Sequence, residues 1–240
     1  MAPQRIRIYP MQILYEDNHL IAVYKPTGVL VQGDKSGDKC LMDLVKDYLK
    51  EKYKKTGNVY LGLVHRLDRN VQGIVLFAKT SKGASRLSEQ FREHAVEKIY
   101  HAIVEGKMKK EKETLAHWLK KDEKTNKTTV YGLQTTGAQR ADLSYEVVAT
   151  LPPPLSPPRA GGRARTLLKI KLGTGRSHQI RAQLSAIGHP IVGDVKYGAK
   201  EVLKDQSIAL AATSLTFKTA TGDEEKTIEV EVPKEWKNLI

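Results

Sequence analysis

One carboxylate among basic side chains marks the segment of this chain best suited to carry chemistry. From Leu61 to Thr80 the sequence reads LGLVHRLDRNVQGIVLFAKT, and Asp68 stands among Arg66, Arg69 and His65. A neighbouring guanidinium favours the ionised form of an acid, so Asp68 is expected to carry its charge. Taken alone, an Arg-x-Asp pattern is more often a weak surface ion pair, and only the rest of the chain can favour a catalytic role.

Two apolar runs must position this segment. Residues 60–64 and 73–78 are rich in apolar and β-branched residues and predict buried strands. The polar residues between them are then fastened at both ends to a rigid core, which suits a catalytic group. If residues 64–68 continue as extended chain, Arg66 and Asp68 lie on the same face.

A second group of basic residues begins at a glycine-rich turn. Gly173 and Gly175 predict the turn, Ser177 is a candidate N-cap, and an apolar stripe with helical spacing follows from Ile180 to Ile187. The start of a helix presents free backbone N–H groups and the positive end of a dipole, which favour an anion. The basic side chains beside it are Arg176, His178 and Arg181. An ordinary capped helix with a basic exposed face is the alternative for this segment alone.

Together the two segments resemble the RluA family of RNA pseudouridine synthases. Residues 65–73 read HRLDRNVQG, and residues 174–198 match the family pattern TGR-x-HQIR followed by GHPI-x-GD-x-x-YG. Residues 13–31 and 96–106 resemble the opening strand pair with Lys-Pro-x-Gly and the strand with Lys-x-Tyr-x-Ala. The triplet Asn70-Val71-Gln72 departs from the Asp-Thr-Ser of many members, which leaves open how the neighbouring loop is braced.

The resemblance implies an isomerisation that needs no cofactor. The bond from C1′ of ribose to N1 of uracil breaks, the base turns, and C1′ joins C5. A carboxylate stabilises or captures the positive charge that develops at C1′, as in retaining glycosidases. The resemblance makes Asp68 that carboxylate, acting either by attack on C1′ or by removal of the C2′ proton. It makes Arg176 the partner that holds Asp68, and Tyr100 the ring against the uracil. A flipped uridine is required; Arg66 matches the arginine that fills the vacated space, and Ile180 the apolar wall of the base pocket.

The order of expected elements predicts an α+β fold. Helices are expected at 41–54 and 81–94, the second capped near Thr80 or Ser81, and strands at 99–105, 128–133, 141–149, 166–171, 208–217 and 227–232. The resemblance implies the pseudouridine synthase fold, a bent, mainly antiparallel mixed sheet with flanking helices and a central cleft. We expect residues 1–12 to be an N-terminal extension, with no S4-type RNA-binding domain, and residues 13–240 to form the catalytic domain.

Two segments are expected as surface insertions. Residues 107–129 are highly charged and predict an exposed loop or hairpin, whereas residues 151–165 combine a proline run, a diglycine and three arginines. A simple extension of a hairpin is favoured for 151–165, and an RNA-gripping arm is the alternative.

Composition favours a polyanionic partner. The chain has 40 Lys and Arg against 27 Asp and Glu, a formal net charge of +13, and phosphate contacts dominate the affinity for nucleic acids. We expect RNA, ribosomal or transfer, as the partner, and neither DNA nor a membrane. Candidate RNA contacts are Arg69, Arg163, Arg165 and Arg181.

Other site classes find little support. His65, His178 and His189 have no metal-ligand spacing, and Gly-Thr-Gly at 173–175 is too short for a dinucleotide site, so neither metal nor cofactor is expected. A single cysteine and an N-terminus without a signal-like apolar core predict a cytoplasmic protein. A monomer is the default. A lapsed, RNA-binding synthase scaffold and a nucleoside hydrolase remain as alternatives; the hydrolase lacks an evident second catalytic carboxylate.

Overall fold

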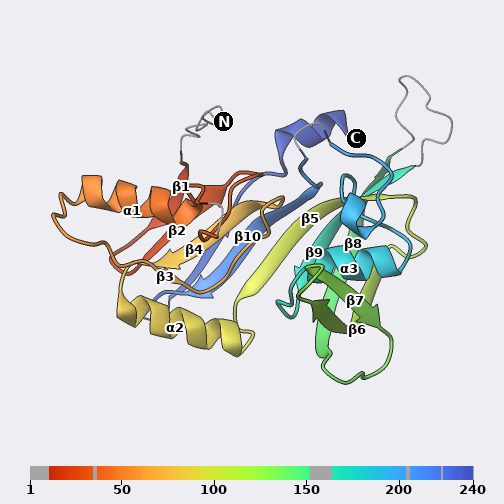
Figure 1. The fold of residues 1–240 in the computed structure, drawn as a ribbon, viewed down its shortest axis with the longest axis horizontal. Helices are drawn as coiled ribbons and strands as arrows, with labels where there is room; N and C mark the ends of the chain where they lie inside the picture. Colours follow the sequence, from red (N-terminus) through yellow and green to blue (C-terminus); the bar gives the residue numbers. More distant parts are fainter. Residues whose placement is uncertain (1–10, 35–36, 152–163, 204–205, 223, 240) are drawn as a thin grey trace.

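A single mixed sheet organises the computed structural model, which describes residues 11–34, 37–151, 164–203, 206–222 and 224–239 (Figure 1). The strands of the described residues are β1 (Ile13–Glu16), β2 (Leu20–Lys25), β3 (Gly62–Leu63), β4 (Gln72–Ala78), β5 (Glu97–Glu105), β6 (Lys112–Asp122), β7 (Lys127–Tyr131), β8 (Gln139–Leu151), β9 (Arg165–Leu172), β10 (Leu210–Lys218) and β11 (Glu225–Glu229). The helices are α1 (Leu41–Lys52), α2 (Ser81–Arg92) and α3 (Gln179–Ala186), with 3-10 turns η1 (Val195–Tyr197) and η2 (Lys234–Asn238).

The strands lie in the order β1-β2-β4-β10-β5-β9-β8-β6-β7, with β3 beside β4 and β11 beside β10. Only β4 and β10 run parallel among the paired strands described here; the other pairs are antiparallel. At this junction Gly73 has φ +123°, and a Cβ there would lie 2.1 Å from the carbonyl oxygen of Ala212. Glycine is therefore required where the two halves of the sheet join.

Helices α1 and α2 cover opposite faces of one half of the sheet. Side chains alternate along β2, so Ile21 and Val23 share a core with α1, whereas Leu20 and Ala22 share a core with α2. Thr80 caps α2, its hydroxyl accepting a hydrogen bond from the N–H of Gly83 at 3.1 Å, as the sequence predicted.

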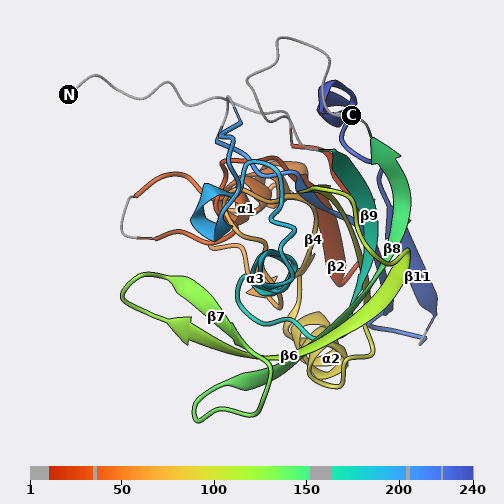
Figure 2. The ribbon, with the colours of Figure 1, turned by 90° about the vertical axis from the view of Figure 1, so that its right-hand side faces the viewer.

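The other half of the sheet curves around α3 (Figure 2). Ile180 and Leu184 of α3 are buried in the same core as Leu143 and Tyr145 of β8. Strands β8 and β9 pair up to Leu151 and Arg165, with one shift of register between Val147 and Ala149. The two strands therefore form a hairpin; residues 152–163 lie outside the described part. The result is the expected α+β fold, a bent mixed sheet with helices on its faces.

The charged segment 107–129 is more than a surface loop. It contains β6 and the start of β7, which form a hairpin, and β6 also pairs with β8 in the main sheet. Leu115 and Leu119 of β6 are buried. The expected strand at residues 60–64 is reduced to Gly62–Leu63. No helix within the described residues is long and apolar enough to cross a membrane.

Candidate active site

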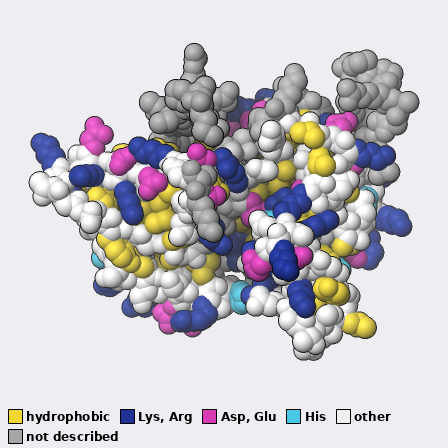
Figure 3. All heavy atoms as spheres, in the orientation of Figure 1, with side chains coloured by type: hydrophobic (Ala, Val, Ile, Leu, Met, Phe, Trp, Pro, Cys, Tyr) yellow, Lys and Arg dark blue, Asp and Glu magenta, His cyan; other side chains and the backbone are white. Residues whose placement is uncertain are grey.

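A cavity of about 770 Å³ lies between the two halves of the sheet. Its lining comes from the segment after β3, the end of α2, β5, the turn before α3, and α3 itself. The space-filling view shows the surface hollowed between these halves (Figure 3). A cavity of this size accommodates a nucleotide-sized group.

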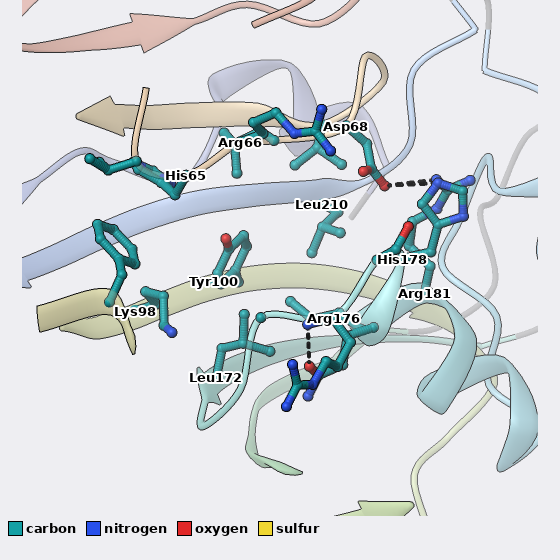
Figure 4. A pocket seen from close by; sticks show the side chains of 18 of the residues that line it. His65, Arg66, Asp68, Lys98, Tyr100, Leu172, Arg176, His178, Arg181 and Leu210 are labelled. Atoms are coloured by element: carbon teal, nitrogen blue, oxygen red, sulfur yellow. Dashed lines mark hydrogen bonds and ion pairs between the residues drawn. The ribbon is translucent and has the colours of Figure 1, made fainter. Parts of the chain in front are cut away.

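Asp68 enters the cavity from the segment between β3 and β4. Leu67 is buried, whereas Arg66 is exposed and Asp68 is partly exposed, so the two charged side chains point away from the core. Both line the cavity (Figure 4). The segment has no strand pairing, but the alternation predicted from extended chain is present.

Arg181, from α3, holds Asp68. Its Nη1 donates to Oδ2 of Asp68 at 2.8 Å, while Nε and Nη2 donate to the two oxygens of Asp194 at 2.7 and 2.9 Å. Burial disfavours the charge of Arg181, but its hydrogen bonds and charge contacts with Asp194 and Asp68 together raise its pKa. One permanent cation therefore bridges a buried carboxylate and the cavity carboxylate.

The expectation that Arg176 pairs with Asp68 is wrong. The Nε of Arg176 donates to the backbone carbonyl of Arg140 at 3.1 Å, and none of the described acids forms an ion pair with it. Arg176 lies in the turn before α3, whereas Arg181 is the third residue of the helix and points to Asp68. The same contacts correct the assignment of Arg181, which is only 6% exposed and so is no surface contact for phosphate.

The start of α3 also differs from the expectation. His178, not Ser177, is the N-cap, with a left-handed backbone and no capping side-chain bond. The side chain of Gln179 stabilises the turn instead: its Oε1 accepts from the N–H of Arg176 and the hydroxyl of Thr174, at 3.0 and 2.7 Å.

His178 is the second basic residue at Asp68. Its Nε2 lies 3.7 Å from Oδ2 of Asp68, and its Nδ1 lies 2.9 Å from the hydroxyl of Tyr197. That hydroxyl already accepts from the N–H of Thr128 at 2.8 Å, so its proton is free to be donated to Nδ1. Burial lowers the pKa of His178 despite the nearby Asp68. A neutral ring with its proton on Nε2, toward Asp68, satisfies all of these contacts.

Tyr100 and Ile180 both line the cavity. Tyr100 lies on β5 and is 9% exposed, and Ile180 on α3 is 4% exposed. Burial, and then the charge of Asp68, raise the pKa of Tyr100, so it is a neutral phenol at physiological pH. The ring and hydroxyl of Tyr100, rather than a phenolate, face the cavity.

Two buried groups brace the segment that carries Asp68. Lys25 is fully buried, and its ammonium donates to the carbonyls of Pro26 and Arg69, both at 3.0 Å. Burial lowers the pKa of Lys25 to about 7. Gln72 accepts from the hydroxyl of Tyr24 at 2.8 Å and donates to Glu235 at 3.0 Å. These contacts show how the loop is braced where the triplet departs from the family pattern.

His65 makes structural contacts with β4 and α2. Its Nε2 accepts from the N–H of Leu76 in β4 at 2.9 Å, and its ring stacks on Phe91 of α2 with centroids 4.9 Å apart. Burial lowers its pKa to about 4, which keeps the accepting nitrogen unprotonated. His65 thus fastens the start of the Asp68 segment to β4.

The remaining candidate RNA contacts differ in their exposure and in the groups they bind. Arg69 is exposed and binds the carbonyl of Gly28 and the carboxylate of Asp38 at 3.0 and 3.3 Å. Arg165 is 8% exposed and pairs with Glu201 at 2.8 Å, so it is a buried structural residue. Arg163 lies outside the described residues. Within them, no group of three or more His, Cys, Asp or Glu could hold a metal ion.

Comparison with known proteins identifies the family to which this chain belongs. Residues 19–186 match the family model described as RNA pseudouridylate synthase. The chain belongs to the RluA family of RNA pseudouridine synthases. It is therefore an isomerase that acts on RNA.

The family's curated members extend over nearly the whole chain. The chain is 30% identical over 240 residues to "tRNA pseudouridine synthase C" of Vibrio parahaemolyticus, covering 96% of this chain and 94% of that protein. It is 28% identical over 241 residues to "Ribosomal large subunit pseudouridine synthase D" of Zymomonas mobilis, covering 96% and 72%. The solved structure of human RNA pseudouridylate synthase domain containing 4 has a TM-score of 0.74 at 22% identity, covering 95% and 90% of the two chains, which establishes the fold.

Three supporting residues had no role in the sequence analysis. Asp194 and Tyr197 lie within the matched GHPI-x-GD-x-x-YG pattern, and Lys25 within Lys-Pro-x-Gly. Their presence in those patterns was the available signal. What they contact depends on the fold, which brings Asp194 to Arg181 and Lys25 to the carbonyl of Arg69.

Proposed function

We propose that this chain converts uridine to pseudouridine in transfer or ribosomal RNA, with Asp68 as the reacting carboxylate. The observation that carries the proposal is the division of labour between its oxygens. Oδ2 is held by Arg181, while Oδ1 accepts no hydrogen bond from any described residue, and Asp68 lines the cavity. Asp68 is thus fixed, and one oxygen is available to the substrate.

The proposed reaction uses that free oxygen at the ribose. The C1′–N1 bond breaks, and Asp68 either captures C1′ or removes the proton at C2′; both need the carboxylate ionised. The detached uracil turns against the Tyr100 ring and the apolar wall made by Ile180. C5 then bonds to C1′, C5 loses its proton, and N1 gains one, so the isomerisation needs no redox partner.

Entry of the uridine requires that the base leave its stack. A base inside an RNA helix cannot present C1′ to a cavity, so the nucleotide must flip out. Arg66 is exposed at the mouth of the cavity beside Asp68. We assign it to the space that the base vacates. Arg176, which has no acidic partner among the described residues, is assigned to RNA backbone contact.

The named activities of the relatives support the choice of RNA. One relative is named for transfer RNA and another for the large ribosomal subunit, and the chain carries a formal net charge of +13. We propose transfer or ribosomal RNA as the partner, acted on by a monomer in the cytoplasm.

Two experiments test the function. Purified protein is incubated with transfer and ribosomal RNA transcripts that carry tritium at C5 of uridine, and release of tritium into water is measured; we expect release. Pseudouridine mapping in cells with and without the protein then identifies the site. Binding without release in every transcript would indicate a lapsed synthase, and free uracil would indicate a hydrolase.

A further inference from the structure

Lys98 is a buried cation that the proposed mechanism does not use. It lies on β5, is 7% exposed and lines the cavity. No described residue accepts a hydrogen bond or forms an ion pair with its ammonium group. The ammonium lies over the ring of Phe91, whose centroid is 6.0 Å from Nζ. Burial lowers the pKa of Lys98, and burying an amine without a hydrogen-bond partner costs free energy of folding.

Its position relates it to the base pocket. Lys98 and Tyr100 are two residues apart on β5, so they share a face of the sheet, about 7 Å apart along the strand. Both side chains line the cavity, and Figure 4 shows Lys98 beside Tyr100 on the side of His65, with Asp68 and Arg181 at the other end. If the base of a nucleotide lies on Tyr100 and its ribose reaches Asp68, the Lys98 end of the cavity remains open to a neighbouring part of the RNA.

The charges around the cavity favour an anion at this end. Among the described residues that line the cavity, Asp68 is the only acid, and Arg181 already pairs with it. The lining also contains four cations that form no ion pair with a described residue: Arg66, Arg92, Lys98 and Arg176. Four cations around one cavity repel one another until a negative group enters.

We propose that Lys98 forms a phosphate subsite, which binds the backbone phosphate adjacent to the target uridine. This inference rests on the proposed function, because it takes the target base to lie on Tyr100. A buried ammonium gains most from a partner with a full negative charge, and a phosphate oxygen supplies one. A uracil carbonyl supplies only a partial charge, and contact with the base itself is the competing outcome.

The test combines a side-chain change with a change in the RNA. The probe is a stem–loop oligonucleotide that spans a uridine shown to be modified. In separate oligonucleotides the phosphate 5′ or 3′ of that uridine, or one several nucleotides away, is replaced by an uncharged methylphosphonate. Lys98→Met keeps the length of the side chain and removes its charge. Kd and single-turnover rate are measured for each combination.

The expected result is coupling at one flanking linkage. Lys98→Met and the methylphosphonate at that linkage should each weaken binding about 10-fold or more, as loss of a charged hydrogen bond does. Together they should weaken it no more than either alone. The single-turnover rate at saturating enzyme should change less than about threefold. The distant methylphosphonate should show no coupling.

A matched control removes the same charge on the other side of the sheet. Lys169 of β9 is exposed and lies opposite His101 of β5 in the strand register. Both residues therefore lie on the face of the sheet opposite Lys98 and Tyr100. Lys169→Met should show no coupling to either flanking linkage. Lys98→Met should also melt no lower than the wild type, because an unpaired buried charge has been removed; a role confined to structure predicts a lower Tm.

Several results would overturn the proposal. If Lys98→Met and the methylphosphonate weakened binding additively at both flanking linkages, the phosphate contact would be excluded. It would also be excluded if the wild type bound both flanking methylphosphonates with native affinity. This second test does not depend on whether the variant folds. Loss of rate without loss of affinity would assign Lys98 to the base. In each case the wild type still forms pseudouridine; failure of the proposed function would appear instead as a wild type with no turnover.

Discussion

The two oxygens of Asp68 meet different surroundings, and this division explains the residues around it. Oδ2 lies against Arg181 and 3.7 Å from Nε2 of His178, whereas Oδ1 accepts no hydrogen bond from a described residue. Asp194, only 1% exposed, binds the opposite edge of the same guanidinium. The arginine is thus oriented by a buried acid and orients the reacting one.

This arrangement predicts different consequences for two arginines of the same motif. Arg181→Ala leaves Asp194 buried without its cation, so we expect a loss of about 3–5 kcal/mol in the free energy of unfolding and loss of turnover. Arg176→Ala removes one bond to a carbonyl, and we expect at most about 1 kcal/mol, weaker RNA binding and persistent turnover. Denaturant unfolding and tritium release measure both.

Arg181→Lys serves as the control for charge. It keeps the cation, but its single nitrogen lacks the planar guanidinium whose separate nitrogens reach Asp68 and Asp194, so it should recover only part of the stability and activity. If Arg176→Ala proved as unstable and inactive as Arg181→Ala, the assignment of the Asp68 partner would fail.

The buried Lys25 predicts a pH dependence of stability. In the unfolded chain the amine keeps its proton up to pH about 10.5, whereas in the fold burial lowers the pKa to about 7. Between these values the unfolded state binds more protons, so this residue makes stability rise with pH, by at most ~1.4 kcal/mol per pH unit.

Unfolding of the wild type and of Lys25→Met, measured from pH 6 to 9, isolates the contribution, because the other titrating groups are common to both. The wild type should gain stability relative to the variant as pH rises through 7. If the difference in stability between the two proteins stayed constant or shrank, Lys25 would keep its proton in the fold throughout this pH range, and burial would not lower its pKa as described.

The place of a residue in the cavity was predictable from the chain where a motif contained one candidate, and less so where two arginines of one motif competed. Asp68, Tyr100 and Ile180 all line the cavity. Arg176 and Arg181 both stand in the second motif, and the difference between them arises where α3 begins. His178 takes a left-handed conformation and Gln179 starts the helix, a geometry decided by contacts with Asp142 and Thr174, distant in the chain or outside the helix.

At the scale of elements, the β6–β7 hairpin is tied to the start of α3. The N–H of Thr128 in β7 donates to the hydroxyl of Tyr197, and the hydroxyl of Thr128 donates to the carbonyl of Ser177 at 2.9 Å. Since Tyr197 also contacts His178, the hairpin supports the group beside Asp68. The charged sequence of 107–129 indicated exposure, but Leu115 and Leu119 on one face of β6 bury it against the sheet, a tertiary contact that charge alone did not predict.

Tyr197→Phe tests this connection. It leaves the N–H of Thr128, a residue 3% exposed, without its acceptor, so we expect a loss of about 1–3 kcal/mol of stability and a several-fold lower rate as His178 loses its orientation. Tyr131→Phe is the matched control: it removes a hydroxyl from the same hairpin, one with no hydrogen bond to a described residue. Equal effects of the two changes would argue against the connection.

At the scale of the whole molecule, charge governs RNA affinity. A chain with a formal net charge of +13 should bind RNA with an affinity that falls steeply with salt, in proportion to the phosphates neutralised. Because β8 and β9 remain paired up to Leu151 and Arg165, residues 152–163 can be replaced with a short glycine turn. We expect affinity and choice of uridine to survive. A loss of either, in salt titrations and pseudouridine mapping, would favour an RNA-gripping arm.

The most direct measurement is turnover by Asp68→Asn. Asparagine keeps the size of the side chain and removes the charge that the ribose needs, so tritium release and pseudouridine formation should fall to background. RNA binding should persist, because phosphates supply most of the affinity and Asp68, an anion, contacts none of them. Substantial turnover by Asp68→Asn would contradict the mechanism and with it the assignment of the site.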